Sequence, residues 1–152
     1  MSTVFKITKN PPSLDTFAAL YIDAGWIKKA DKSKLKSIFK NTSRWWTARE
    51  KATGNVIGMA RILTDWRRYA CIYDVIVSKK KRKRGVGTAI MKAMLHELAK
   101  AKIDIIHLWP TKGKIAFYRR IGFKVLSREQ PMMKYKPSSN SSLEPTSGHA
   151  TS

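Results

Sequence analysis

A nearly uninterrupted apolar stretch, Tyr69–Val77 (YACIYDVIV), occupies the middle of the chain. Apolar residues at almost every position predict a strand covered on both faces, which places it centrally in a sheet. Asp74 is the single charge within it. The basic run KKKRKR follows and leads into Gly85-Val86-Gly87 and an amphipathic segment. The chain is therefore expected to pass from a buried strand, through a basic loop that contains glycine, into a helix.

Apolar residues in the rest of the chain repeat with the period of either a strand or a helix. One helix is expected to begin after an N-cap at Ser13 and to end near Gly25. The other expected helices are 32–40, 85–101 and 114–120, and the expected strands are 3–8, 45–50, 56–63, 69–77, 103–109, 123–126 and 132–135. The order β-α-α-β-β-β-α-β-α-β-β predicts an α/β fold on a mixed sheet.

Composition predicts one globular domain followed by a short tail. With 152 residues, of which 43% are hydrophobic and 27% charged, the chain can bury a core, and wholesale disorder is excluded. Residues 137–152 (PSSNSSLEPTSGHATS) hold almost nothing that could be buried, so they are expected to form a flexible tail rich in Ser, Pro and Thr. The folded domain is expected to span residues 1–136.

The charge balance is strongly basic. Lys and Arg number 31 against 10 Asp and Glu, a formal net charge of +21, which predicts attraction to nucleic acid, a phosphorylated cofactor or an acidic protein. The single cysteine, Cys71, excludes an intramolecular disulfide and a zinc site built from cysteines, and we expect no metal. No apolar run reaches about 18 residues and the N-terminus lacks a secretory pattern. We therefore expect no membrane association and a cytoplasmic protein, with a nuclear location compatible with the run Lys79–Arg84.

The basic loop has the chemistry of an anion cradle. A helix start offers unpaired N–H groups and the positive end of the helix dipole, and glycines let a phosphate approach the backbone. A dinucleotide fingerprint is rejected because the frame Gly85–Ile90 has no third glycine, and no phosphate-loop (Walker A) motif is present. A nuclear-localisation or nucleic-acid patch and a merely solvated charge run remain as alternatives.

Two motifs resemble those of the GCN5-related N-acetyltransferase (GNAT) superfamily. Residues 82–87, Arg-Lys-Arg-Gly-Val-Gly, match its Arg/Gln-x-x-Gly-x-Gly/Ala motif, and residues 116–123, Ala-Phe-Tyr-Arg-Arg-Ile-Gly-Phe, look like its Phe-Tyr…Gly-Phe landmark. The resemblance covers residues 3–135. It implies a mixed, mostly antiparallel central sheet flanked by helices, acetyl-CoA as acetyl donor, and an amine acceptor. Dimers are common among proteins similar to this one.

The resemblance also implies where acetyl-CoA would bind. Backbone N–H groups of residues 84–88 and the Arg82 side chain would hold the pyrophosphate, and main-chain groups of residues 75–77 would accompany the pantetheine arm. Tyr118 would lie near the sulfur and protonate the departing thiolate, whereas helical position alone would make it a packing residue. The expected cofactor-binding residues are Val75, Ile76, Val77, Arg82, Lys83, Arg84, Gly85, Val86, Gly87, Thr88, Phe117 and Tyr118.

Asp74 is the candidate catalytic residue on the acceptor side. A lone carboxylate in a buried strand should be paired or have a raised pKa. It would bind the substrate ammonium or accept its proton through water; the alternative is a structural bond to an Arg or a Trp N–H. Tyr21, Trp26, Trp45 and Tyr73 are candidates to line the acceptor pocket, although core packing explains such aromatics equally well. Asp23, Glu50 and Asp65 could join Asp74 in an acidic pocket.

Two classes of function follow. The first is an N-acetyltransferase that moves the acetyl group of acetyl-CoA directly to a primary amine, with small aralkylamine- or polyamine-like acceptors favoured over protein or histone lysines. The second is a basic module that retains the fold and binds nucleic acid. No recognised nucleic-acid motif accompanies the charge, and the densest basic run coincides with the expected phosphate loop.

Overall fold

The computed structural model describes residues 4–129 and 131–134, and the chain forms two compact units, residues 1–109 and 110–152. The first unit contains one sheet in the order β1-β2-β3-β4-β5. Neighbouring strands are antiparallel except for β4 and β5, which are parallel. Its elements are β1 (Phe5–Thr8), α1 (Leu14–Asp23), α2 (Lys32–Lys40), β2 (Arg44–Glu50), β3 (Val56–Thr64), β4 (Tyr69–Val77), a 3₁₀ turn (Lys79–Lys81), α3 (Val86–Lys100) and β5 (Ile105–Leu108).

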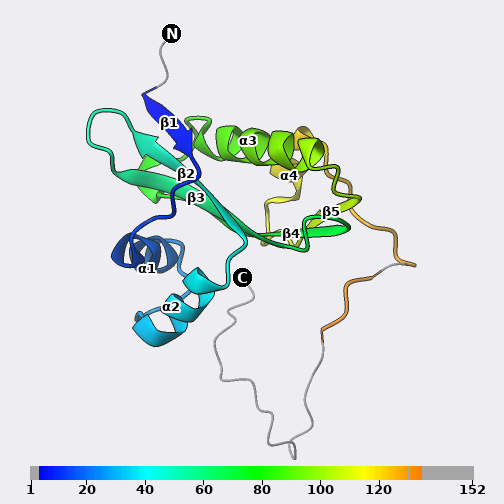
Figure 1. Ribbon diagram of the computed structural model, residues 1–152, viewed down its shortest axis with the longest axis horizontal. Coiled ribbons are helices and arrows are strands. Elements are labelled where there is room, and N and C mark those ends of the chain that lie inside the picture. The colour runs from blue at the N-terminus through cyan, green and yellow to red at the C-terminus, as the bar shows by residue number, and fades with distance from the viewer. Residues whose placement is uncertain (1–3, 130, 135–152) are drawn as a thin grey trace, which may run out of the picture. The chain divides into compact units, whose positions relative to one another are not determined.

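Helices α1 and α2 cover one face of this sheet, and α3 covers the other (Figure 1). The first helix begins at its predicted N-cap, where Ser13 Oγ accepts the Thr16 N–H at 3.1 Å. The structure shows that Asp31 caps the second helix, because its Oδ1 accepts the Lys34 N–H at 3.1 Å. Their apolar stripes pack with the inward residues of β2, β3 and β4 in a cluster formed by Phe17, Leu20, Tyr21, Leu35, Trp45, Met59 and Ile76.

Helix α3 packs closely against β3. Its apolar stripe of Val86, Ile90, Met94 and Leu98 is buried, as its sequence period predicts. A Cβ at Gly58 would lie 3.1 Å from Val86 Cγ1 and 3.2 Å from Ile90 Cδ1. The absence of a side chain at Gly58 therefore lets the first turn of α3 approach the sheet next to the end of β4.

Strand β4 is irregular at Asp74. Between the pairs Met59–Ile76 and Arg61–Tyr73, β4 contains one more residue than β3, and Asp74 within this bulge adopts a left-handed backbone with φ of 53°. The parallel ladder with β5 joins residues 69–72 to residues 105–108 and stops there. Within the part of the chain that the structure describes, residues 73–77 therefore pair with β3 alone, and their other edge is unpaired.

The fold class predicted from the sequence is confirmed, with two differences in detail. Tyr69 and Tyr73 are exposed, so β4 is central but is not covered on both faces along its whole length. Residues 123–126 and 132–134 do not form strands, and Tyr135 lies outside the described residues. A strand needs a partner, and within the described part of the second unit the only regular element is the helix α4 (Ile115–Ile121). The predicted tail, residues 137–152, also lies outside the described residues.

Candidate active site

The loop between β4 and α3 exposes main-chain N–H groups at its end. Gly85 is the N-cap of α3, has φ of 76°, and offers no side chain to cap the helix. Lys83 also has a positive φ, 59°. A Cβ built at Gly85 would meet nothing within 4 Å, so the space beside this backbone is open. The first N–H groups of a helix have no partner within it. The start of α3 therefore presents free donors and the positive end of a helix dipole, which fits a phosphate group.

Three contacts hold this basic loop in place. The Lys79 N–H donates to Asp23 Oδ2 of α1 at 2.8 Å. Lys81 pairs with Glu50 at the end of β2, and the hydrogen bonds from Lys81 and then Thr53 lower the pKa of that carboxyl group. These bonds come from two separate elements of the first unit, so the loop is fixed to both α1 and β2.

Arg82 makes the third contact, because its Nε donates to the Val77 carbonyl at 3.0 Å. The guanidinium has five N–H donors in total. One of them ties the loop to the end of β4, and the remaining ones can bind an anion.

Asp74 is paired, as a carboxylate in a buried strand should be. Its Oδ2 accepts hydrogen bonds from the Tyr21 hydroxyl and from Arg61 Nε. The Asp74 and Arg61 side chains are only 14% and 12% exposed. Burial lowers the pKa of Arg61, but the charge and hydrogen bond of Asp74, together with the contribution of Tyr21, outweigh this effect and leave that pKa raised. Burial, followed by the charge of Asp74, raises the pKa of the Tyr21 phenol, which therefore stays protonated.

The four aromatic candidates for the acceptor side fall into different environments. Tyr73 is 39% exposed beside this cluster, and the Arg61 guanidinium lies 5.4 Å from its ring. A hydrogen bond with Cys71, together with burial, raises the pKa of Tyr73 to about 12. Trp26 packs against Tyr21 with ring centroids 5.5 Å apart. Trp45 is only 6% exposed and packs between aromatic rings of α1 and α2, so the structure places it in the core.

The acidic pocket suggested by the sequence is not formed. Asp23 and Glu50 hold the basic loop, and Asp74 is paired with Arg61. Asp65 accepts backbone N–H groups of residues 67–69 in the turn between β3 and β4, and the first of these bonds lowers its pKa most. Each carboxylate therefore stabilises a different segment, because each finds its own donors.

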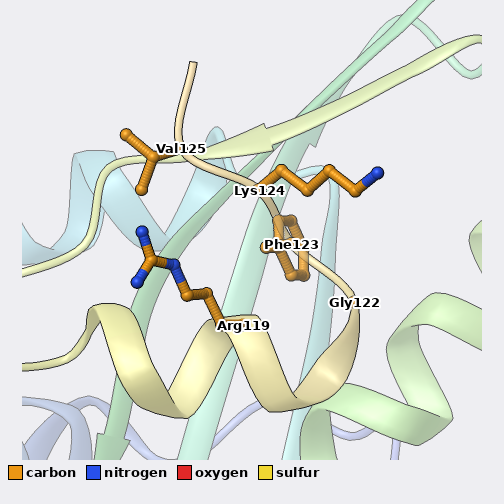
Figure 2. Close-up of a pocket in the computed structure, with 5 residues that line it drawn as sticks. All are labelled: Arg119, Gly122, Phe123, Lys124 and Val125. Carbon is orange, nitrogen blue, oxygen red and sulfur yellow. The ribbon is translucent and has the colours of Figure 1, made fainter. Parts of the chain in front are cut away.

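The second unit carries Phe117 and Tyr118 on α4. The Tyr118 ring packs against Phe117 and Phe123, with centroids 5.0 and 6.0 Å apart. Burial raises the pKa of Tyr118 to about 12. A pocket of about 390 Å³ lies at the end of this helix, where Arg119 rises toward the segment that bears Lys124 and Val125 (Figure 2). None of the residues expected to act in catalysis or binding is among those that line it.

Arg61 is the functional candidate that the sequence analysis missed. It is the single charge within Val56–Leu63, an otherwise apolar predicted strand that precedes the one containing Asp74. Two opposite charges in neighbouring buried strands are a signal that they pair. The exact partners could not be read from the sequence, because the irregularity in β4 changes the register.

Comparison with known proteins identifies the family. A model of the acetyltransferase (GNAT) family matches residues 11–123. The chain belongs to this family. The match covers every described element from α1 to α4, and it confirms the resemblance found in the sequence.

Individual GNAT relatives agree with this assignment. The chain is 30% identical over 101 residues to the uncharacterized N-acetyltransferase ycf52 of Pyropia yezoensis, a match over 65% of this chain and 58% of the relative. A probable acetyltransferase from methicillin-resistant Staphylococcus aureus has a TM-score of 0.76 at 21% identity, covering 88% of this chain and 99% of that one. Glucosamine-6-phosphate N-acetyltransferase from Arabidopsis thaliana has a TM-score of 0.68 at 17% identity, covering 88% and 99%. These structural likenesses show the GNAT fold.

Among the residues that the structure describes, no helix is both long and apolar enough to cross a bilayer.

Proposed function

We propose that this GNAT protein transfers the acetyl group of acetyl-CoA directly to a primary amine. The observation that supports it best is the arrangement at the end of β4. Among the described residues, one edge of the strand has no partner over residues 73–77, and the strand leads into an α3 N-terminus that no side chain of its N-cap, Gly85, covers. An extended ligand with a pyrophosphate at one end needs both features side by side.

The donor would be held mainly by main-chain groups. N–H groups of residues 84–88 would bind the pyrophosphate, with Arg82 and Lys83 adding charge, and residues 75–77 would bind the pantetheine arm. Acetyl-CoA supplies an activated acetyl group as a thioester. The protein contributes mostly by positioning, since an amine that lies against a thioester reacts with little further help. From α4, Phe117 would pack against the bound donor and Tyr118 would donate its phenol hydrogen to the sulfur.

Asp74 would act on the acceptor. An alkylammonium with a pKa of about 10.4 must lose a proton before it can attack. The bonds from Tyr21 and Arg61 both end on Oδ2, so an acceptor would meet this carboxylate at Oδ1. Tyr21, Trp26 and Tyr73 lie around the cluster and would border the bound amine, whereas Trp45 would support them from the core. The new N–C bond forms as the C–S bond breaks, and the proton leaves through Asp74 and water.

The sequence favours a small acceptor of the aralkylamine or polyamine kind, with a protein lysine as the alternative. A screen of primary amines with acetyl-CoA, read as release of free thiol, distinguishes these acceptors. Each active amine should produce one acetylated product for each thiol released. If no amine or peptide lysine among a broad set is acetylated, the proposed activity is wrong.

Thermal stability provides an independent test of the donor site. Coenzyme A should raise the melting temperature of the wild-type protein, because it binds the folded state alone. Gly87→Val should abolish this shift by placing side-chain atoms where the phosphate approaches. Ala99→Val adds comparable bulk to an exposed position of the same helix and is the matched control. An unchanged shift in Gly87→Val would contradict the proposed phosphate site.

The same melting-temperature assay also tests the second function that the sequence left open, a basic module that binds nucleic acid. A duplex oligonucleotide should not displace coenzyme A from an enzyme whose basic loop serves the cofactor. Binding to DNA that depends steeply on salt, with no response to coenzyme A, would instead support the module.

A further inference from the structure

Helix α2 carries a row of lysines whose one ion pair among the described residues is a long one, between Lys32 and Asp15. Lys32, Lys36 and Lys40 recur every four residues, so they lie along one side of the helix, and all three are exposed. Leu35 lies on an adjacent side of the helix and is buried in the core. We call these three residues the lysine row.

The lysine row is costly to the isolated helix. Like charges four residues apart repel one another, and the segment of α2 (KSKLKSIFK) contains no acid. The nearest carboxylates relieve this little. Asp31 uses its side chain to cap the helix, and Asp15 reaches Lys32 at 3.7 Å in a pair whose two side chains are largely exposed. An external anion with matching spacing would remove the repulsion.

The segment that follows the lysine row contacts Arg61, the partner of the carboxylate that is proposed to accept the amine proton. Thr42 lies two residues after the end of α2, and its Oγ1 accepts a hydrogen bond from Arg61 Nη1 at 3.3 Å. Arg61 in turn pairs with Asp74. A ligand that lies along the row would therefore reach the end of α2 that is connected through Thr42 and Arg61 to Asp74.

We propose that the lysine row docks an acidic polypeptide segment and thereby presents a lysine or N-terminal amine of that polypeptide for acetylation. The proposal rests on the acetyltransferase function and, of the two acceptor classes given above, selects the polypeptide amine over the small amine that the sequence favours. Successive lysines of the row are about 6 Å apart along the helix axis. Alternate side chains of an extended peptide are about 6.6 Å apart on one face, which gives carboxylates nearly the same spacing.

Nucleic acid fits this surface less well. Its bases carry no alkyl amine, so it offers no good nucleophile for the reaction. Single strands are usually gripped by exposed aromatic rings, and on α2 the ring of Phe39 packs against Trp45 at 5.2 Å. The lysine row therefore offers positive charge, but α2 offers no exposed aromatic ring on which a base could stack.

Binding is tested with two peptides, one of alternating Glu and Gly ending in lysine, the other with Gln in place of Glu. The acidic peptide should bind the wild type at low salt, and Lys32→Gln, Lys36→Gln and Lys40→Gln together should weaken it roughly tenfold, since each exposed ion pair contributes about a factor of two. The control replaces the exposed Lys51, Lys92 and Lys100 by Gln, which removes equal charge elsewhere. An equal loss in both variants would mean that net charge alone attracts the peptide, and the proposal would fail.

Acetylation supplies a second readout. The lysine of the acidic peptide should show a lower KM than that of the neutral peptide, and the row variant should erase this difference while leaving turnover of a small amine unchanged. Equal KM values for the two peptides in the wild type would overturn the proposal. So would a duplex oligonucleotide of equal charge that binds through the row more tightly than the acidic peptide. Binding specific to the row with no acetylation of any amine would instead refute the proposed activity and leave docking standing.

Discussion

At the scale of single residues, the pair formed by Asp74 and Arg61 carries two functions that must be separated. Replacing Asp74 by Asn leaves Arg61 charged in a poorly solvated position. We expect this change to lower the free energy of unfolding by about 1–3 kcal/mol. It should also reduce kcat far more than it weakens coenzyme A binding. Chemical denaturation, turnover and coenzyme A titration measure the three quantities.

A double variant shows which function dominates. Arg61→Gln with Asp74→Asn removes both charges, so more than half of the lost stability should return. Turnover should stay low if Asp74 accepts the proton that the amine loses. Turnover that recovers together with stability would show that Asp74 acts only as a structural partner of Arg61.

Tyr118 offers a prediction about pH. Burial holds its pKa at about 12, so the phenol stays protonated well above neutral pH and is a weak acid toward a thiol with a pKa of about 8.5. It should donate a hydrogen bond to the sulfur more than it transfers a full proton. We therefore expect Tyr118→Phe to lower kcat only about 10-fold to 100-fold, with KM for acetyl-CoA unchanged.

The pH profile of turnover checks this role of Tyr118. The wild type should show no fall that reflects tyrosine ionisation between about pH 8 and pH 10, because the phenol remains protonated there. Tyr69→Phe changes an exposed tyrosine and serves as the control. Full turnover in Tyr118→Phe would exclude the phenol from the reaction.

At the scale of elements, α1 links the two halves of the proposed site. Its last turns carry Tyr21, which bonds Asp74, and Asp23, which accepts the Lys79 N–H at the start of the basic loop. Asp23→Ala removes an acceptor worth about 1 kcal/mol. We expect KM for acetyl-CoA to rise roughly threefold to tenfold while kcat changes little.

Two further variants define this role of Asp23. Asp23→Asn retains an oxygen that can accept the backbone N–H, so its KM should stay near the wild-type value. Asp15→Ala removes a largely exposed carboxylate from the first turn of the same helix and should have no effect. If Asp23→Asn raises KM as much as Asp23→Ala, the charge of Asp23 matters and the hydrogen bond to the loop does not.

Local signals made most elements predictable. Ser13 and Asp31 cap α1 and α2 in the structure, and the four-residue period of α3 marks the residues it buries. Residues 123–126 have the apolar pattern of a strand, but that pattern says nothing of whether a partner strand lies within reach. A bond from Asp74 to an Arg was one of the alternatives that the sequence left open, but Arg61 could not be singled out, since the extra residue in β4 sets which side chains meet.

At the scale of the whole molecule, the net charge of +21 should govern how quickly an anionic donor arrives. Coenzyme A carries several phosphate charges, and the field of a basic protein raises its association rate at low ionic strength. The Debye length falls to about 3 Å at 1 M salt, so this attraction is largely lost there. We expect Kd for coenzyme A to rise roughly tenfold between low and high salt, mostly through slower association.

Acetylpantetheine lacks the nucleotide phosphates. Its use as donor therefore separates the effect of the protein's electrostatic field on donor binding from any effect of salt on acetyl transfer. Its KM should hardly change with salt, because it feels neither the field nor the phosphate loop. Stopped-flow association of coenzyme A, followed beside turnover with acetylpantetheine, gives both quantities on one protein. If salt weakens the binding of both donors equally, the net charge does not act by attracting the donor phosphates. It then affects either the stability of the fold or the binding of the acceptor. The lysine row would then be the first surface to neutralise, since it is a basic feature that lies apart from the phosphate loop in sequence.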